Sequence, residues 1–381
     1  MLRTKAWKRL KRNTARMGPL DQLYLERAYE LAERAAGSTS PNPAVGAVVV
    51  LNGEIVGEGY HHRAGEPHAE VHALRAAGER ACGATLYVSL EPCNHTGRTP
   101  PCSHAVAEAG IARVVAGIPD PNPRTAEGGL AYLRDRGIGV EIANDARARA
   151  IVEPFAHAIR SQRPYVTLKM AMSLDGFIAT KSGRQEWLTG EEARAFVRDL
   201  RISHDAVGVG AGTVRVDNPN LTVRPPHHRL RQYVRVVLCE TDTVDPGSNV
   251  FRQREGYAKT IVVAPAGAAA KFENLADAAD VLFVGDAGAA DLDLETGLRA
   301  LKARGIESLL CEGGPTMAGH LIAHGLVDRV VWLVAPRFLR SETSVPVLAS
   351  ESLAGVRGLR FDRVERLGPD LLLSGIIDRH V

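Results

Sequence analysis

The segments GEPHAE at residues 65–70 and EPCNHTGRTPPC at residues 91–102 decide how the first half of this chain folds. They supply one imidazole, from His68, and two thiols, from Cys93 and Cys102. This is the ligand set of a catalytic zinc, which keeps its fourth position for water and lowers the pKa of that water to about 7. Glu70 follows the histidine closely and is placed to move a proton from the water to a leaving amine. The combination predicts the hydrolytic site typical of zinc nucleobase deaminases.

Apolar and turn residues around these segments predict the strands and the helix that bring them together. We expect a buried strand over residues 45–51, a hairpin turn at Asn52-Gly53 and a returning strand over residues 54–60. A helix is expected to begin at His68 and end at Gly78, and the next strand covers residues 84–90. The simpler alternative is that His68 and Glu70 are ordinary first-turn residues and that the two cysteines are core thiols or a disulfide.

Length and composition indicate two domains. The chain has 381 residues, 45% of them hydrophobic, and exceeds the size at which a single core stops growing. No apolar run reaches the roughly 18 residues that a membrane helix needs, and no hydrophobic stretch follows the basic start as in a secretory signal. We expect a disordered extension or mis-assigned start over residues 1–19, a zinc domain over 20–150, a helical join over 151–163 and a second domain over 164–381.

The five cysteines argue against a disulfide framework, because their number is odd and the chain is long. Thiolate zinc ligands need a reducing compartment, so we expect a cytoplasmic protein. Cys82, Cys239 and Cys311 are expected to be buried structural thiols.

Charge is unevenly distributed along the chain. The formal net charge is +3, but residues 1–16 contain seven Lys or Arg and no acid, so the remainder carries −4. This tail has no apolar face, which favours a disordered extension, or Met17 as the true start, over a tail that binds nucleic acid or a membrane. The acidic body argues against a nucleic-acid groove.

Strand and helix patterns alternate along the rest of the chain, which predicts helices packed on sheets. In the first half we expect strands over residues 113–118 and 138–142 and helices over 127–136 and 145–160. A new strand begins at Tyr165. Further strands are expected over residues 206–209, 235–239, 260–264, 281–284, 308–311, 330–334 and 371–375.

Two glycine-rich turns follow strands in the second half. Residues 312–319 (EGGPTMAG) open an expected helix, where backbone N–H groups and the helix dipole favour a phosphate. Residues 208–213 (GVGAGT) lack the full Rossmann spacing, which argues against a Rossmann domain. By themselves, the two turns are as readily structural as they are ligand sites.

Together the motifs resemble the bifunctional deaminase/reductase family of riboflavin biosynthesis, over nearly the whole chain after Pro19. The first half matches in PNPAVG at residues 41–46 and in the two segments quoted above. The most discriminating feature is the eight-residue loop between Cys93 and Cys102, since cytidine and tRNA adenosine deaminases have two residues there.

In the second half, the resemblance to the family's reductase domain rests on four features. These are KMAMSLDG at residues 169–176, Trp187, TVRVDNPNLTVR at residues 213–224 and the glycine turn at Glu312.

The resemblance implies an α/β protein with two folds. These are an N-terminal cytidine-deaminase-like three-layer α/β/α domain and a C-terminal dihydrofolate-reductase-like α/β domain. The first is then expected to use Zn²⁺ to remove the exocyclic amine of 2,5-diamino-6-ribosylamino-4(3H)-pyrimidinone 5′-phosphate. The second is expected to use NADPH to reduce 5-amino-6-(5-phosphoribosylamino)uracil to its ribitylamino form. The implied partners are this phosphorylated pyrimidine and further copies of the chain, as a dimer or tetramer, without nucleic acid or membrane.

The resemblance also assigns residues. His68, Cys93 and Cys102 are the implied zinc ligands, with Glu70 as the proton shuttle. Lys169 and Glu312 match positions tied to substrate handling and hydride transfer. The implied NADPH contacts are Ala171, Trp187, Thr213, Asp217, Gly314, Pro315, Thr316, Met317, Ala318 and Gly319. The implied substrate contacts are Gln185, Arg201, Leu221, Arg224 and Glu312, and an arginine fork suits a phosphate.

Two departures from the family pattern concern the reductase. Residues 182–187 read SGRQEW where the family usually has Ser-Gly-Glu-Ser-x-Trp, which makes Gln185 an uncertain substrate contact. Cys239-Glu240 stands where the family commonly has Asp-Ser or Asp-Thr. A carboxylate at residue 240 would oppose a ribose 2′-phosphate.

Other interpretations stay open at this point. The extra histidines of the first half, at positions 61, 62, 72 and 95, are expected to face solvent or substrate, since three ligands already complete an open zinc site. Arg98 is equally a phosphate contact or a loop anchor. The rival functions are a nucleic-acid-editing deaminase, which the 5% aromatic content disfavours, and a zinc deaminase whose C-terminal half is a non-catalytic oligomerisation or ligand-binding module.

Overall fold

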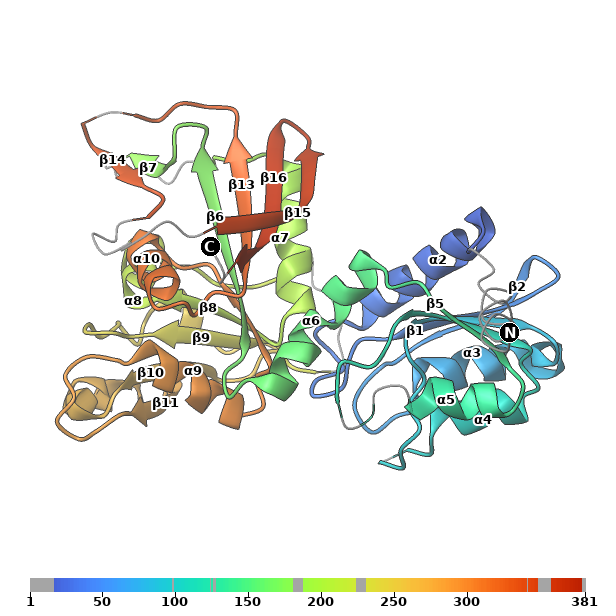
Figure 1. Cartoon of the computed structure of the whole chain (residues 1–381). Coiled ribbons are helices and arrows are strands. Elements are labelled where there is room, and N and C mark those ends of the chain that lie inside the picture. Colours follow the sequence, from blue (N-terminus) through green and yellow to red (C-terminus); the bar gives the residue numbers. More distant parts are fainter. Residues whose placement is uncertain are drawn as a thin grey trace, which may run out of the picture. The chain divides into compact units, whose positions relative to one another are not determined.

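The computed structural model describes residues 17–97, 99–123, 125, 128–180, 188–223, 231–340, 342–348 and 358–378. Contacts divide the chain into two compact units that separate between Glu153 and Pro154. Each unit is an α/β domain with its own main sheet (Figure 1). Within the described ranges, no helix is long and apolar enough to cross a bilayer.

The N-terminal unit is built on a five-stranded sheet in the order β2-β1-β3-β4-β5. Strand β1 runs antiparallel to β2 and β3, whereas β3, β4 and β5 are parallel. Asn52 and Gly53 make the β1–β2 hairpin turn with φ of 52° and 84°. The predicted strands of this half are confirmed to within a residue or two, as β1 (Gly46–Leu51), β2 (Glu54–Tyr60), β3 (Thr85–Leu90), β4 (Arg113–Ile118) and β5 (Gly139–Ile142).

Helices cover both faces of this sheet, which confirms the three-layer α/β/α fold (Figure 1). On one face, Tyr29 of α2 (Pro19–Ala35) and Ala148 of α6 (Ala146–Arg160) both lie against Gly117 of β4. The other face carries α3 (Ala69–Ala77), the short η1 (Gly78–Ala81), α4 (Cys102–Glu108) and α5 (Gly128–Asp135).

Glycines in β2 let α3 approach the sheet closely. A Cβ at Gly57 would lie 2.2 Å from the Ala73 carbonyl oxygen, and one at Gly59 would lie 2.6 Å from that of Ala69. A side chain at either position would push the helix away from the sheet. The start of α3, with His68 as its N-cap, is therefore fixed over the sheet.

The C-terminal unit is built on a nine-stranded sheet in the order β11-β10-β9-β8-β12-β6-β13-β16-β15. The strands from β11 to β13 are parallel, and β16 runs antiparallel to both its neighbours. The predicted strands are confirmed as β6 (Tyr165–Ser173), β8 (Ala206–Gly210), β9 (Val234–Leu238), β10 (Thr260–Pro265), β11 (Ala279–Val284), β12 (Ser308–Cys311), β13 (Arg329–Ala335) and β16 (Asp370–Asp378).

Three strands of this unit have no counterpart in the sequence prediction: β7 (Phe177–Thr180), β14 (Ser344–Pro346) and β15 (Gly358–Leu367). Strand β15 is exposed along nearly its whole length, so it lacks the apolar alternation that marks a half-buried strand. Strands β7 and β14 are short, and within the described part of the chain they pair only with each other.

Alternate residues of the central strands enter separate cores on opposite faces of this sheet. Val330 of β13 packs with α9 (Leu294–Ala303) and α10 (Pro315–Ala323), whereas Val331 packs with α7 (Glu191–Ser203). A third core includes α8 (Ala211–Asp217), η2 (Asn249–Phe251) and η3 (Ala266–Leu275). Cys239 and Cys311 are buried, as predicted, and burial raises the pKa of each to about 12. The prediction was wrong for Cys82, which is exposed after η1.

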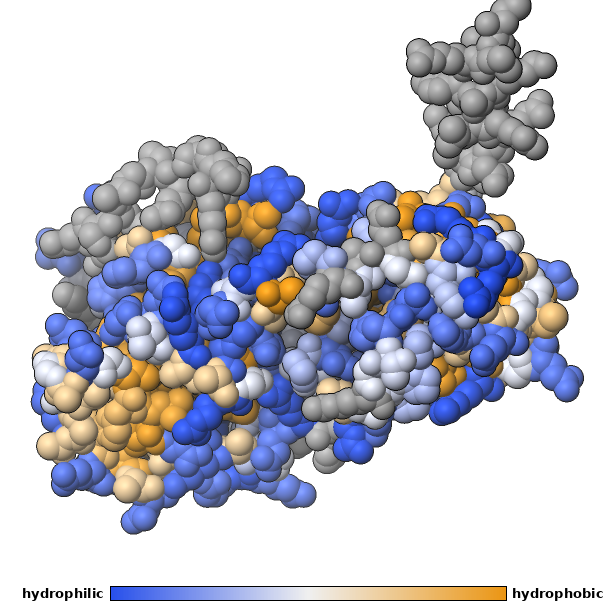
Figure 2. All heavy atoms as spheres, turned by 60° about the horizontal axis from the view of Figure 1, so that its bottom comes forward, coloured by the Kyte–Doolittle hydropathy of each residue, from blue (hydrophilic) through white to orange (hydrophobic). Residues whose placement is uncertain are grey.

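Hydrophilic residues cover most of the face in Figure 2, and apolar residues gather on the side of the C-terminal unit. Most of the large apolar side chains of the described ranges are buried in the cores, and those that are exposed, such as Phe338, are few.

Candidate zinc centre and cofactor cavity

His68, Cys93 and Cys102 come together at the ends of three elements in the N-terminal unit. His68 caps α3, Cys93 follows β3, and Cys102 begins α4. The Nδ1 atom of His68 lies 3.1 Å from the Cys102 sulfur and 3.5 Å from the Cys93 sulfur. Within the described residues this is the only cluster of His, Cys, Asp or Glu whose donor atoms lie close enough together, within 4.8 Å, to share a metal ion.

The two thiols of this cluster are electrostatically coupled through a hydrogen bond. The hydrogen bond with Cys102 lowers the pKa of Cys93 to about 4, and the same bond, with burial, raises the pKa of Cys102. One imidazole and two thiols are the donor set that zinc prefers, and they leave a fourth position open. The cluster therefore fits the zinc that the sequence predicts.

Glu70 lies in the first turn of α3, beside this cluster. Its side chain is 3% exposed, and its Oε2 atom has no hydrogen-bond partner among the described residues. Burial raises the pKa of Glu70 to about 7, and the charge of Cys93 adds to this effect. A buried carboxylate oxygen without a partner is costly, and this one lies on the same helix as His68, next to the residues that could hold a metal ion.

Glu91 holds the segment that carries Cys93, a role that the sequence analysis missed. Its carboxylate accepts hydrogen bonds from the backbone N–H groups of Gly129 and Leu130, at 3.0 and 3.1 Å, and of Asp120, at 3.0 Å. A Cβ at Gly129 would lie 1.7 Å from the Pro92 carbonyl oxygen. The strand end and the start of α5 therefore meet backbone to backbone. The Glu-Pro-Cys motif itself was a signal for this role.

The nearby histidines do not all lie where they were expected. His61 is buried, 2% exposed, rather than facing solvent, and its ring nitrogens contact the Pro67 carbonyl oxygen and the Asn42 amide, both at 3.1 Å. Its ring packs edge-on to that of His68, with centroids 5.0 Å apart. Burial lowers the pKa of His61 to about 4, so it supports the zinc ligand as a neutral ring. Arg98 lies outside the described residues.

A cavity of about 960 Å³ opens in the C-terminal unit, near the upper end of the range for cofactor sites. It is lined from β6, from the segments that follow β8, β9 and β12, and from α7. Ligands of open α/β sheets bind at this carboxyl edge of the strands. The parallel sheet thus brings together residues that are far apart in the sequence.

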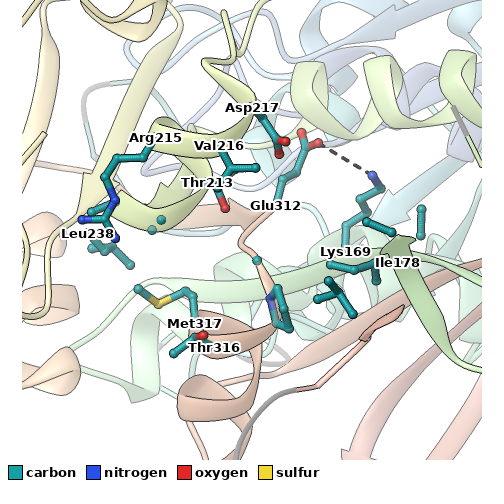
Figure 3. A pocket seen from close by; sticks show the side chains of 18 of the residues that line it. Lys169, Ile178, Thr213, Arg215, Val216, Asp217, Leu238, Glu312, Thr316 and Met317 are labelled. Atoms are coloured by element: carbon teal, nitrogen blue, oxygen red, sulfur yellow. Dashed lines mark ion pairs between the residues drawn. The ribbon is translucent and has the colours of Figure 1, made fainter. Parts of the chain in front are cut away.

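Three charged side chains meet in this cavity. Both oxygens of Glu312 accept hydrogen bonds from Arg201, at 2.5 and 3.0 Å, and the Lys169 ammonium lies 3.8 Å from Glu312 Oε2 (Figure 3). Burial tends to raise the pKa of Glu312, but the positive charges of Arg201 and Lys169 outweigh it and hold the pKa below its ordinary value. Burial lowers the pKa of Lys169. Two cations around one carboxylate leave a net positive charge, which favours an anionic ligand.

The backbone of the cavity is suited to a phosphate-bearing cofactor. Gly314 caps α10, and the first turn of this helix lines the cavity, where the positive end of the helix dipole favours a phosphate. The backbone at Gly212 is open, since a Cβ there would meet nothing within 4 Å. At Gly314, a Cβ would come within 3.2 Å of the Thr213 hydroxyl. The cavity and its glycines therefore fit NADPH.

The structure places most, but not all, of the other predicted reductase residues in the cavity. Ala171, Thr213, Asp217, Gly314, Pro315, Thr316 and Met317 line it, as does Arg201. Ala318 and Gly319 are instead buried in α10, and Leu221 is 5% exposed in a core. None of these three is among the described residues of the cavity wall. Gln185, Trp187 and Arg224 lie outside the described residues.

Known families match both units. Residues 19–118 match the cytidine and deoxycytidylate deaminase zinc-binding region, and residues 164–373 match the RibD C-terminal domain. The second match favours a reductase over a non-catalytic C-terminal module.

Relatives of known name cover nearly the whole chain. The riboflavin biosynthesis protein RibD of Escherichia coli K12 is 40% identical over 371 residues, which is 93% of this chain and 98% of the relative. That of Aquifex aeolicus is 41% identical over 358 residues, with 93% and 98% covered.

Solved structures agree over the same extent. Acinetobacter baumannii RibD has a TM-score of 0.77 at 36% identity, and covers 94% of this chain and 99% of that one. A Thermotoga maritima protein described as a diaminohydroxyphosphoribosylaminopyrimidine deaminase/5-amino-6-(5-phosphoribosylamino)uracil reductase also has a TM-score of 0.77, at 33% identity and with the same coverage. The chain therefore belongs to the RibD family of riboflavin biosynthesis, and is a bifunctional enzyme that joins a zinc-binding deaminase domain to an NADPH-dependent reductase domain.

Proposed function

We propose that this enzyme acts on two consecutive intermediates. Its N-terminal domain would hydrolyse the exocyclic amine of 2,5-diamino-6-ribosylamino-4(3H)-pyrimidinone 5′-phosphate and release ammonia. Its C-terminal domain would reduce the resulting 5-amino-6-(5-phosphoribosylamino)uracil to the ribitylamino product. The observation that carries the first step is the convergence of His68, Cys93 and Cys102 beside the buried Glu70, whose Oε2 atom has no hydrogen-bond partner among the described residues.

In the deaminase domain, His68 Nδ1 and the sulfurs of Cys93 and Cys102 would hold the zinc. The metal supplies a water of lowered pKa near neutral pH. The Oε2 atom of Glu70 would take a proton from the attacking water and give it to the departing amine. Glu91 would hold the Cys93 segment in place through its bonds to Asp120, Gly129 and Leu130.

In the reductase domain, the reduction adds a hydride to C1 of the ribose and breaks the ring C1–O bond, so the ring oxygen needs a proton. Lys169 would supply it, since burial lowers its pKa and makes the ammonium a stronger acid. Arg201 would orient Glu312, which in turn holds Lys169. Ala171, Thr213, Asp217 and the start of α10 would contact NADPH, with Trp187 as a further contact. Arg224, Gln185 and Leu221 remain proposed substrate contacts, as Ala318 and Gly319 remain proposed cofactor contacts.

We further propose a cytoplasmic homo-oligomer, a dimer or tetramer, that binds neither nucleic acid nor membrane. The thiol ligands, which need reducing conditions, support the location. Light scattering after size-exclusion chromatography tests the assembly, and a monomer at micromolar concentration would contradict it.

One experiment tests both steps. Purified protein with its metal content measured is given the phosphorylated diaminopyrimidinone, and ammonia release and NADPH oxidation are followed together. We expect one ammonia released and one NADPH oxidised per substrate molecule, and neither with cytidine 5′-phosphate. Ammonia release without NADPH oxidation would contradict the proposed reductase substrate. NADPH oxidation without ammonia release would contradict the proposed deaminase substrate.

A further inference from the structure

Glu240 introduces a negative charge into the cofactor cavity. It follows β9 and lines the cavity together with Thr241, Asp242 and Arg215 of α8. Figure 3 shows Arg215 and Leu238 on one side of the cavity and Lys169 on the other. Since Lys169 and Glu312 mark the reacting end, the residues around Arg215 surround the end that receives the adenosine half of the cofactor.

This end bears on the choice between NADPH and NADH. In dinucleotide sites, a carboxylate after a strand hydrogen-bonds the ribose 2′-hydroxyl of NADH, whereas an arginine accommodates the 2′-phosphate of NADPH. Here both types of group line one cavity. An unpaired Glu240 would repel a 2′-phosphate and favour NADH.

Arg215 is the cation of this end. Its Nη2 atom lies 2.7 Å from Asp242 Oδ2, and the two side chains are 50% and 55% exposed. Exposed pairs of this kind are weak, so the guanidinium can turn to a phosphate at little cost. Its fork of donors suits bidentate phosphate binding.

His320 contacts the carboxylate of Glu240. It lies in the last turn of α10, and its Nδ1 atom lies 2.7 Å from Glu240 Oε1. The His320 side chain is 39% exposed, and His320 is not one of the described residues that line the cavity.

We propose that His320 masks the carboxylate of Glu240 and, with Arg215, makes the adenosine end of the cavity select a 2′-phosphate over a 2′-hydroxyl. The Glu240–His320 pair then helps this chain to select NADPH over NADH. It compensates for a carboxylate at a position where a 2′-phosphate would otherwise be disfavoured. The inference rests on the assignment of the cavity to NADPH.

Equilibrium binding tests this without turnover. Calorimetric titrations of the full chain with NADPH and with NADH give the ratio of the two dissociation constants. We expect His320→Ala to weaken NADPH binding about tenfold and leave NADH binding within twofold. We expect Arg215→Gln to lower NADPH binding by a similar factor. Glu240→Gln should keep or improve NADPH binding, and the double variant Glu240→Gln/His320→Ala should restore the wild-type ratio.

His324→Ala is the matched control, because His324 follows one turn later and its Nδ1 contacts only the His320 carbonyl oxygen among the bonds described. It should leave both constants unchanged. The same titrations with adenosine 2′,5′-bisphosphate and 5′-AMP isolate the 2′-phosphate from the nicotinamide half.

The outcomes are distinct. No binding of either dinucleotide to the wild-type protein would overturn the cofactor assignment itself. Normal binding with an unchanged ratio in His320→Ala, an equal loss in His324→Ala, or a failure of the double variant to restore the ratio would overturn the role of the Glu240–His320 pair.

Discussion

The zinc centre and the reductase cavity are assembled in different ways. The zinc donors lie within residues 68–102, at the ends of consecutive elements, so their spacing in the sequence already brings them together. Lys169, Arg201 and Glu312 are spread over much of the second domain and meet only because β6 and β12 are neighbours in a parallel sheet. A local site can be recognised from its motif, whereas a dispersed one depends on topology.

The two sites also differ in how charge is balanced. The zinc cluster combines two thiols and a buried carboxylate with one imidazole, a set of donors that fits an added cation. The group of Lys169, Arg201 and Glu312 is compensated within the protein and keeps an excess positive charge. Loss of a group should therefore impair metal-dependent chemistry in the first site, and both folding and catalysis in the second.

The sharpest test of this contrast is Glu70→Gln. We expect deamination to fall by about 10²- to 10⁴-fold, because the proton shuttle is lost. The zinc content should stay at the wild-type level, and reduction of supplied uracil substrate should not change. Metal analysis and the two separate assays measure this.

Glu79→Gln, an exposed change just beyond α3, is the control for Glu70→Gln and should be silent. Loss of zinc from Glu70→Gln would show that Glu70 supports the metal rather than the proton transfer.

Glu312→Gln should affect both stability and reduction. It leaves Lys169 and Arg201 without their carboxylate in a largely buried place, and removing one partner of a buried ion pair costs about 3 kcal/mol or more. We expect reduction to fall roughly 10²-fold, as for loss of a positioned acid–base group. Deamination should persist, and urea unfolding measures the loss of stability.

The pH dependence gives this variant a second readout. The folded-state pKa of Glu312 is lowered, so its stabilising contribution is present at neutral pH and is lost as the pH falls through that lowered pKa. Glu312→Gln should remove this part of the acid sensitivity. Glu295→Gln, at an exposed pair with Arg299, should change stability by less than about 0.5 kcal/mol. If Glu312→Gln and Glu295→Gln lowered stability equally, the buried ion pairs of Glu312 would have no special role.

The sequence predicted the local zinc centre better than the dispersed reductase cavity. The strands around the zinc segments have apolar runs and turn residues, and their ends were predicted to within two residues. The strand β15 was missed because nearly all its residues are exposed, and β7 and β14 because they are short. Ala318 fell in a matching motif but faces the core, since successive residues of a helix point about 100° apart and only some of a motif's residues can face the cavity.

Contacts between distant segments were beyond sequence reasoning. Arg201 and Glu312 were each identified through the family resemblance, but their hydrogen bonds to one another were not foreseen. Glu240 was noted as a departure, and nothing in the sequence indicated that His320 pairs with it. Such pairs depend on which helices the sheet order brings together.

Gly129→Ala tests the backbone contact that holds the zinc segment. Its Cβ would lie 1.7 Å from the Pro92 carbonyl oxygen, so either the segment or α5 must move. We expect zinc affinity to fall about 10- to 100-fold, as for the loss of groups that orient metal ligands. Competition with a chelator measures it.

Gly128→Ala is the neighbouring control for Gly129→Ala, because its Cβ would meet only the Asn94 Cβ, at 3.8 Å. Comparable zinc loss from both variants would mean that the start of α5, rather than this contact, sets the affinity.

The smallest expected effect is that of Asp21→Asn, which lies away from both sites. Asp21 accepts hydrogen bonds from Arg113 and Tyr87, both at 2.7 Å, and the bond with Arg113 lowers its pKa from 3.8 to about 2. A carboxylate with a lowered folded pKa stabilises the fold above its unfolded pKa, and the benefit is lost as the pH falls from about 4 to about 2. Because solvent screens this partly exposed pair, the loss at pH 7 should stay below about 2 kcal/mol. Urea unfolding of the deaminase domain should show this loss, with both activities unchanged, while exposed Asp135→Asn should have little effect. If Asp21→Asn instead impaired reduction, the two sites would not be independent, and the contrast between a local site and a dispersed one would no longer explain how this enzyme responds to substitution.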